Sequence, residues 1–249
     1  MHNPQNKTLF DDGERMLPTR GDEISFVFSR HKFAYQFAQN YVSGKTVIDV
    51  GCGSGYGSML LAKKAESVLG LDYHAAAIEY CRQNYHAAHL RFKQKDASTI
   101  DAENEFDAAV CFQAIEHFHN PGHFLNQLKK VVKPGGTILI STPNVKKSLK
   151  GSLKNPFHVN EMNYQQFNSL LQKHFSSYEL LGVGYAEKNK MRDFLGKLPF
   201  YQWGKYLKRK SKIKKLANKA LAMTSFQILH NQVERDAADL LAVIKNEKP

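Results

Sequence analysis

The segment Val47-Ile48-Asp49-Val50-Gly51-Cys52-Gly53-Ser54-Gly55-Tyr56-Gly57 decides the fold of this chain. Its first residues are mostly apolar and β-branched, which predicts a short buried strand over 46–50. The glycines that follow favour a tight turn and let the backbone approach a ligand closely at the carboxyl end of that strand. Their spacing is Asp-x-Gly-x-Gly-x-Gly, and no Gly-Lys-Ser or Gly-Lys-Thr follows. The sequence therefore argues against the usual dinucleotide fingerprint and against a P-loop.

Strands and helices alternate along the chain from this segment onward. Apolar residues at helical spacing predict a helix over 22–41 before it, and an Asn cap predicts another helix after residue 163. Further helices are expected near 57–64, 74–85 and 121–132. Strands are expected over 46–50, 67–72, 90–96, 106–112, 137–142, 176–185 and 238–246, the fifth entered through a turn at 134–136. This pattern predicts an α/β fold, a mostly parallel sheet with helices on both faces.

The composition fits one globular domain over residues 1–249, with 42% apolar residues, enough to bury a core. No apolar run approaches the length of a membrane-spanning helix, and the N-terminus lacks the apolar stretch of a signal peptide. The three cysteines, Cys52, Cys81 and Cys111, are odd in number and widely spaced, which suits a reducing compartment. We therefore expect a cytoplasmic protein.

Polar residues follow the ends of the next strands. Asp72 ends the second expected strand, where a carboxylate can accept hydrogen bonds from both hydroxyls of a ribose. Asp96 ends the third, where a carboxylate can accept from an adenine amino group. Gln113 follows the fourth strand. Together with the glycine turn, these residues predict a nucleoside-binding edge of the sheet.

These features occur in the motifs VIDVGCGSGYG, LGLD, KQKDAS, FDAAVCFQAIEHF and LKKVVKPGGTILISTPN. In this combination the sequence resembles the class I S-adenosylmethionine-dependent methyltransferases over residues 45–185. The resemblance implies S-adenosylmethionine as cofactor and a Rossmann-like seven-stranded sheet whose last strand is antiparallel. It divides the chain into an N-terminal substrate or lid arm (1–44), a cofactor-binding core (45–185), a basic helical insert (188–223) and a last strand (238–246).

The resemblance also implies which residues bind the cofactor. The turn after the first strand would hold the methionine end, Asp72 the ribose, Asp96 and Ala97 the adenine, and Gln113 would close over the sulfonium. The full set of cofactor-binding residues implied is Asp49, Gly51, Cys52, Gly53, Gly55, Asp72, Tyr73, Asp96, Ala97 and Gln113.

Two shorter segments carry a narrower resemblance. GERMLP (13–18) and NPFHVNE (155–161) look like bacterial methyltransferases of polysaccharide gene clusters, which methylate sugar hydroxyls or terminal phosphates of surface glycans. The resemblance implies a glycan, a phosphorylated sugar or a lipid-linked glycan intermediate as acceptor. The Glu-His pair at 116–117 also occurs in ubiquinone-type O-methyltransferases, so a small-molecule acceptor of that type is the alternative.

A sugar hydroxyl must lose a proton, and a neutral histidine is a natural base at physiological pH. The candidates are His117, His119 and His158, which follow the fourth and fifth expected strands at the cofactor edge. Each is also the kind of residue that makes purely structural hydrogen bonds. For the acceptor we single out Glu14, Arg15 and Glu161, although the first two would equally suit a solvated ion pair.

Two other functions use the same residues. In metal-dependent RNA 2′-O-methyltransferases, a Glu, a Glu-His pair and a later His surround a divalent ion, and Glu116, His117 and His158 match three of these ligands. Gln113 stands where the first Glu is needed, and a neutral amide is a poor ligand for a hard cation. We therefore expect no metal. The other alternative is an inactive cofactor-binding scaffold, against which the complete set of binding residues argues.

The positive charge is concentrated in one segment. Residues 188–219 hold twelve Lys and Arg and one acid, a net charge of +11 out of +12 for the chain. Apolar residues from Trp203 to Met223 recur there at helical spacing. A basic helix with an apolar stripe is typical of peripheral binding to an anionic membrane. Nucleic acid is a less favoured partner, and a helical lid with solvated lysines is the structural alternative.

Overall fold

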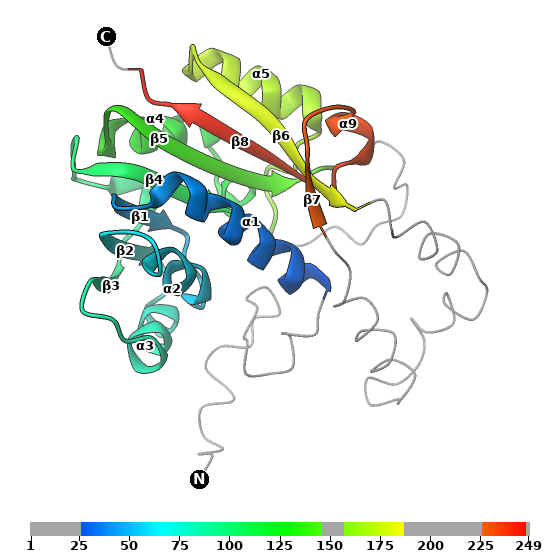
Figure 1. Cartoon of the computed structure of the whole chain (residues 1–249). Helices are drawn as coiled ribbons and strands as arrows, with labels where there is room; N and C mark the ends of the chain where they lie inside the picture. The colour runs from blue at the N-terminus through cyan, green and yellow to red at the C-terminus, as the bar shows by residue number, and fades with distance from the viewer. Residues whose placement is uncertain (1–25, 146–156, 187–225, 248–249) are drawn as a thin grey trace, which may run out of the picture.

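The structure, a computed structural model, describes residues 26–145, 157–186 and 226–247 (Figure 1). The expected arm residues Glu14 and Arg15 and the basic insert 188–223 lie outside the described residues. The strands are β1 (Thr46–Val50), β2 (Ser67–Asp72), β3 (Leu90–Gln94), β4 (Phe106–Phe112), β5 (Val132–Pro143), β6 (Tyr178–Tyr185), β7 (Phe226–Leu229) and β8 (Asp239–Lys245). The helices are α1 (Phe26–Val42), α2 (Tyr56–Ala62), α3 (Ala75–Asn84), α4 (Pro121–Val131), α5 (Tyr164–His174) and α9 (Val233–Asp236).

The strands form one sheet in the order β3-β2-β1-β4-β5-β8-β6-β7. Strands β1 to β5 pair in parallel, and β8 lies antiparallel between β5 and β6. This confirms the predicted mostly parallel α/β sheet and the antiparallel last strand.

The prediction of seven strands is wrong, because β7 adds an eighth strand at the edge, antiparallel to β6. The strand has four residues, and all four are half-buried. Such a short segment carries no alternation of apolar and polar residues long enough to identify it in the sequence.

The turn expected at 134–136 lies inside a strand instead. β5 begins at Val132, which pairs with Phe106, and its next partner pair is Ala108 with Thr137. The intervening Lys133-Pro134-Gly135-Gly136 is therefore a bulge, made possible by Gly135 at a φ of 75°. Asn246 stabilises this bulge with two hydrogen bonds. Its side-chain Nδ2 donates to the carbonyl oxygen of Val132 at 2.7 Å, and its backbone carbonyl oxygen accepts from the amide of Gly135 at 2.8 Å.

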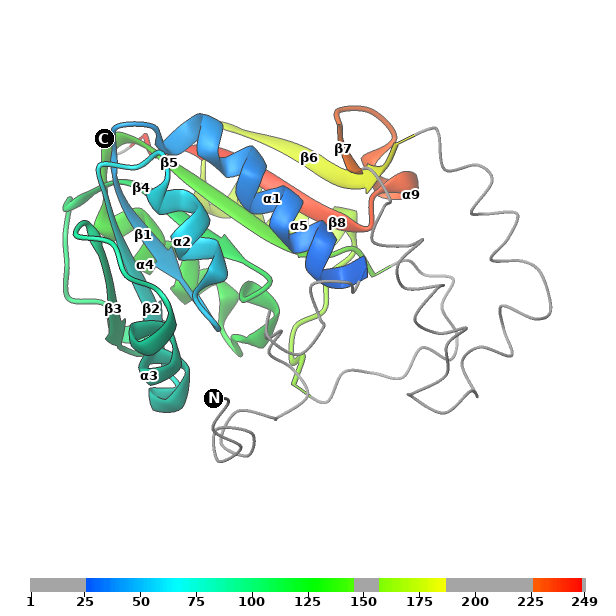
Figure 2. The ribbon, with the colours of Figure 1, turned by 60° about the horizontal axis from the view of Figure 1, so that its bottom comes forward.

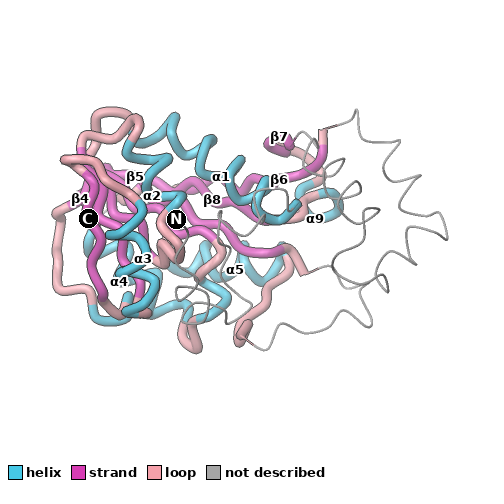
Figure 3. The backbone as a smooth tube through the Cα atoms, turned by 90° about the horizontal axis from the view of Figure 1, so that it is seen from below, coloured by secondary structure: helices cyan, strands magenta, loops and turns pink. Residues whose placement is uncertain are grey.

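The core has one layer on each face of the sheet. Helices α1, α2 and α3 pack on one face, and α4, α5 and α9 on the other (Figures 2 and 3). Alternate residues of β1 divide between them, since Val47 packs in the first layer and Ile48 in the second. The carboxyl ends of the parallel strands meet at one edge of the sheet, the edge where ligands bind in open α/β sheets.

Helix α1 is anchored to this core by the Tyr35 side chain, which is 5% exposed. The Tyr35 hydroxyl lies 3.2 Å from Oδ1 of the fully buried Asp49, and Ser58 Oγ donates to Asp49 Oδ2 at 2.6 Å. The Tyr35 ring also lies over Gly57, where an added Cβ would be 2.1 Å from the ring carbon Cζ. One tyrosine therefore connects α1, β1 and α2.

We expect Gly57→Ala to destabilise the protein by about 1–3 kcal/mol, because the new methyl group collides with the Tyr35 ring. Helix propensity alone would make the alanine variant more stable by about 0.5–1 kcal/mol. The sign of the change in the free energy of unfolding therefore decides between the collision and helix propensity. Urea denaturation measures it. Gly122→Ala in α4 is the comparison: its nearest neighbour is the His174 side chain at 3.0 Å, which can move, so a smaller loss is expected. Unchanged or increased stability of Gly57→Ala would contradict this packing.

Asp49 makes stability depend on pH. Burial raises the pKa of Asp49 to about 7, with a smaller contribution from Asp72, although the Ser58 and Tyr35 bonds act against it. A carboxyl group whose pKa is raised in the folded state favours folding at low pH, and this contribution is lost as the pH rises from about 4 to about 7.

The free energy of unfolding of Asp49→Asn should therefore fall less steeply with pH over this window. The two curves should differ in slope by up to about 1.4 kcal/mol per pH unit. Denaturation at several pH values measures this, and parallel curves for the parent and the variant would contradict it.

Candidate active site

A cavity of about 530 Å³ opens at the carboxyl edge of the sheet. This volume is in the range of small-molecule sites. One end is lined by residues after β1, β2 and β3, and the other by residues of α1, by the turn after β4, and by the segment before α5. The first end includes Gly51, Cys52, Asp72, Tyr73, Asp96 and Ala97, and the second includes Arg30, His31, Glu116, His117 and His158.

The glycine turn after β1 is fixed to the end of β2. The amides of Gly51 and Cys52 donate to the carbonyl oxygen of Leu71 at 2.8 and 2.9 Å, and the amide of Gly53 donates to Asp72 Oδ2 at 3.0 Å. Gly51 has a φ of 75°, and a Cβ there would lie 2.8 Å from the Ala114 Cβ. The turn thus needs glycine both for its backbone angle and for its closeness to the residues after β4.

Asp72 and Asp96 line the cavity at neighbouring strand ends. Asp72 is 6% exposed, and its Oδ1 accepts from the amide of His74 at 2.9 Å. Asp96 Oδ1 accepts from the amide and the hydroxyl of Ser98, both at 2.8 Å, and these bonds lower the pKa of Asp96. Asp96 is therefore an anionic acceptor beside Ala97, as expected for the adenine end.

Gln113 lies between the two ends of the cavity and has a φ of 54°, unusual for a residue with a side chain. Its amide donates to the carbonyl oxygen of Ser141 at 2.9 Å, and its Nε2 lies 3.1 Å from Ser141 Oγ. Strained backbone of this kind is frequent at functional sites.

Three of the residues expected to bind a cofactor, Asp49, Gly53 and Gly55, do not line the cavity. The Asp49 side chain is directed into the core, toward Tyr35 and Ser58, because alternate residues of β1 face opposite layers. Asp49 therefore stabilises the strand that leads into the glycine turn and does not face the cavity. The other seven residues line the cavity, including Tyr73, which is 64% exposed.

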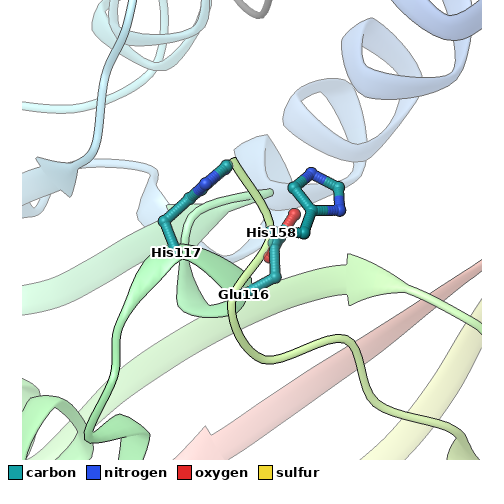
Figure 4. Close-up of side chains that lie close together, drawn as sticks. All are labelled: Glu116, His117 and His158. Carbon is teal, nitrogen blue, oxygen red and sulfur yellow. The ribbon is translucent and has the colours of Figure 1, made fainter. Parts of the chain in front are cut away.

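At the other end, two segments far apart in the sequence are joined by hydrogen bonds. The amides of Val159 and Asn160 donate to the carbonyl oxygen of Glu116 at 3.0 and 2.9 Å. His117 Nδ1 lies 3.0 Å from the carbonyl oxygen of Phe157. These bonds place His158 against His117, with ring centroids 5.0 Å apart (Figure 4).

The three predicted histidines do not all reach the cavity. His117 and His158 line the cavity, and Glu161 Oε1 accepts from His158 Nδ1 at 2.9 Å without lining the cavity itself. His119 is exposed and does not line the cavity. The sequence placed all three at the cofactor edge, after the fourth and fifth strands, but His119 lies beyond the short helix Ile115–His117 and is exposed.

Several residues of α1 line the cavity, and sequence reasoning missed the basic ones among them, Arg30 and His31. Arg30 Nε lies 2.6 Å from Oδ2 of Asp239, a carboxylate that is 1% exposed. Burial, and then the Arg30 cation, lower the pKa of His31 to about 3, so this imidazole is neutral at physiological pH. Both residues lie in a helix predicted from its apolar spacing, which carries no signal for polar residues that line a site.

The cavity suits S-adenosylmethionine. The backbone of the glycine turn after β1 fits a methionine tail. The carboxylate at the end of β2 fits a ribose, and the carboxylate and small residue after β3 fit an adenine, so the three parts follow one another along the edge. Within the described ranges, no helix is both long and apolar enough to span a bilayer.

Comparisons with known proteins agree with this geometry. A family model described as "Methyltransferase domain" matches residues 42–220. A probable S-adenosylmethionine-dependent methyltransferase of Mycolicibacterium smegmatis is 34% identical over 69% of this chain and 67% of its own length. A ubiquinone biosynthesis O-methyltransferase of Methylococcus capsulatus is 31% identical, over 53% of this chain and 57% of its own length. The chain thus spans between about three fifths and two thirds of these relatives.

Among solved structures, the Haemonchus contortus phosphoethanolamine N-methyltransferase 2 in complex with S-adenosyl-L-methionine has the same fold. The TM-score is 0.55 at 14% identity, covering 87% of this chain and 53% of that one. With the family match over residues 42–220, the chain belongs to the methyltransferase-domain family and is a class I S-adenosylmethionine-dependent methyltransferase.

Proposed function

We propose that this methyltransferase acts on an oxygen atom, a hydroxyl or a phosphate, of a surface-glycan sugar or a lipid-linked glycan intermediate. The observation that carries the proposal is the single cavity that joins the cofactor end, at Asp72 and Asp96, to a polar end at His117 and His158. The two ends meet at Gln113. An acceptor at the histidine end would face the reactive centre of the cofactor.

When bound, the cofactor supplies a methyl group on a sulfonium: the oxygen–carbon bond forms as the sulfur–carbon bond breaks, and that electron pair stays on sulfur. The protein contributes position and the exclusion of water. Asp72 would hold the ribose, and Asp96 with Ala97 the adenine. The His117–His158 pair would hold the acceptor oxygen where it loses its proton.

The Arg30 guanidinium at the histidine end supports a polar acceptor that carries phosphate. Arg30 lines this end, and its guanidinium has donors beyond the Nε that faces Asp239. Such a cation suits a phosphate or a phosphorylated sugar. The resemblance of 155–161 to polysaccharide-cluster enzymes supports the same class, since His158 of this segment lines the cavity.

Methylation of a small phenol is the second candidate. A relative named a ubiquinone biosynthesis O-methyltransferase favours it, as do the apolar residues Val27, Phe157 and Pro143 that line the same end. Both candidates are tested with methyl-labelled cofactor and a panel of nucleotide sugars, phosphorylated glycans and catechols. Label in the sugar or phosphate products supports the first, label in catechols alone supports the second, and label in no product contradicts both.

Peripheral membrane contact by residues 188–223 remains a proposal that rests on their sequence alone. Their net positive charge and apolar stripe suit an anionic surface, near which a lipid-linked acceptor would be found. The parent protein should co-sediment with anionic vesicles, and less so as the salt concentration rises. Turnover of a soluble acceptor should be unchanged when Ser replaces Lys208, Arg209, Lys212 and Lys215. Both results together would support the proposal.

Asp72→Ala should weaken S-adenosylmethionine binding by about 1–3 kcal/mol, because a charged hydrogen-bond acceptor for the ribose is removed. Isothermal titration calorimetry measures the affinity. Glu103→Ala, which removes an exposed carboxylate outside the cavity, is the matched control and should bind as the parent does. Equal affinities for Asp72→Ala and the parent would contradict the assignment.

His158→Ala should lower kcat by about 10²–10⁴-fold while cofactor affinity stays within a factor of about two, because the ring acts on the acceptor. The control is His119→Ala, a nearby exposed histidine, whose kcat should be unchanged. Full turnover of His158→Ala would remove this residue from the reaction.

A further inference from the structure

Glu116, His117 and His158 bring one carboxylate and two imidazoles to the histidine end of the cavity (Figure 4). One ligand atom from each side chain lies within 4.8 Å of the other two. Glu116 is 1% exposed, and the two rings are half-buried. Two imidazole nitrogens and one carboxylate oxygen form a donor set that suits divalent transition metals better than magnesium or calcium.

The hydrogen bonds of the two rings fix which nitrogen of each ring carries the proton. A carbonyl oxygen only accepts, so His117 Nδ1, 3.0 Å from the Phe157 carbonyl, carries the proton. His158 Nδ1 donates in the same way to the Glu161 carboxylate at 2.9 Å. In a neutral imidazole this leaves the lone pair on Nε2. Each ring therefore has the carbonyl or carboxylate partner that metal-binding histidines typically have.

The cluster is also held in place by its backbone. The carbonyl oxygen of Glu116 accepts from the amides of Val159 and Asn160, and Glu116 Oε2 accepts from Thr142 Oγ1 at 3.1 Å. The segment that carries His158 is thus fixed onto the residue that supplies the carboxylate. A site whose ligands are held by other bonds in this way is preorganised.

We propose that Glu116, His117 and His158 bind a divalent transition-metal ion at the acceptor end of the cavity. Three protein ligands leave coordination positions open for the acceptor. The role of the ion rests on the proposed function: it holds the acceptor oxygen and lowers the pKa of a hydroxyl, whose proton passes to solvent. His158 then acts as a ligand instead of as the base itself.

The proposed metal site differs from the sequence-based expectation of no metal. That expectation depended on Gln113 as a poor replacement for a fourth, carboxylate ligand. In the structure Gln113 contacts Ser141, and the three remaining residues come together without it.

The test is titration of Co²⁺ into protein freed of metal by a chelator, followed by the visible absorption of the bound ion. We expect bands typical of nitrogen and oxygen ligation in the parent and in His119→Ala, the matched exposed histidine. His117→Ala and His158→Ala should each bind Co²⁺ at least about 10-fold more weakly, with cofactor affinity retained as evidence of folding.

The absence of such bands in the parent, or equal Co²⁺ affinity in the His117 and His158 variants, would overturn the site. Methyl transfer that continues undiminished in the presence of the chelator would overturn the role of the ion while leaving the proposed function intact. If Co²⁺ binds to the site formed by Glu116, His117 and His158 but no methyl group is transferred to any acceptor of the panel, this would support the metal site and count against the proposed function.

Discussion

The attachment of the glycine turn to the end of β2 is the constraint on which the rest of the site depends. Three successive amides, of Gly51, Cys52 and Gly53, donate to Leu71 and Asp72, so the turn cannot move without the neighbouring strand. From below, the buried Asp49 connects β1 to Tyr35 and hence to α1. Because Arg30 and His31 also lie on α1, the contact between Tyr35 and Asp49 positions these two residues at the acceptor end of the cavity.

Much of the cofactor half could be predicted from the sequence, since it depends on short-range rules. A β-branched strand, a glycine turn and an acid at the next strand end lie within a few residues of each other, and parallel strands place their carboxyl ends at one edge. The Asn163 cap is of the same kind: the expected cap is present at the start of α5, where Gln166 adds the second bond of a capping box. The role of Asp49 was less accessible, because its direction depends on which face of the sheet α1 covers.

The acceptor half depends on contacts between distant segments, and here the sequence was insufficient. His158 meets His117 because the amides of Val159 and Asn160 donate to the Glu116 carbonyl oxygen and His117 Nδ1 donates to the Phe157 carbonyl oxygen. Arg30 lies at the cavity because it faces the buried Asp239, a pair more than 200 residues apart in the chain. His119, adjacent in sequence to the true lining residues, is directed outward. Residue type and spacing do not distinguish these cases.

A crystal structure with S-adenosylhomocysteine tests the central claim most directly, that one cavity joins a cofactor end to an acceptor end. The account predicts adenine beside Asp96 and Ala97, ribose on Asp72, and the sulfur near Gln113, on the side that faces Glu116, His117 and His158. Adenine at the histidine end, or a ligand bound outside this cavity, would contradict it.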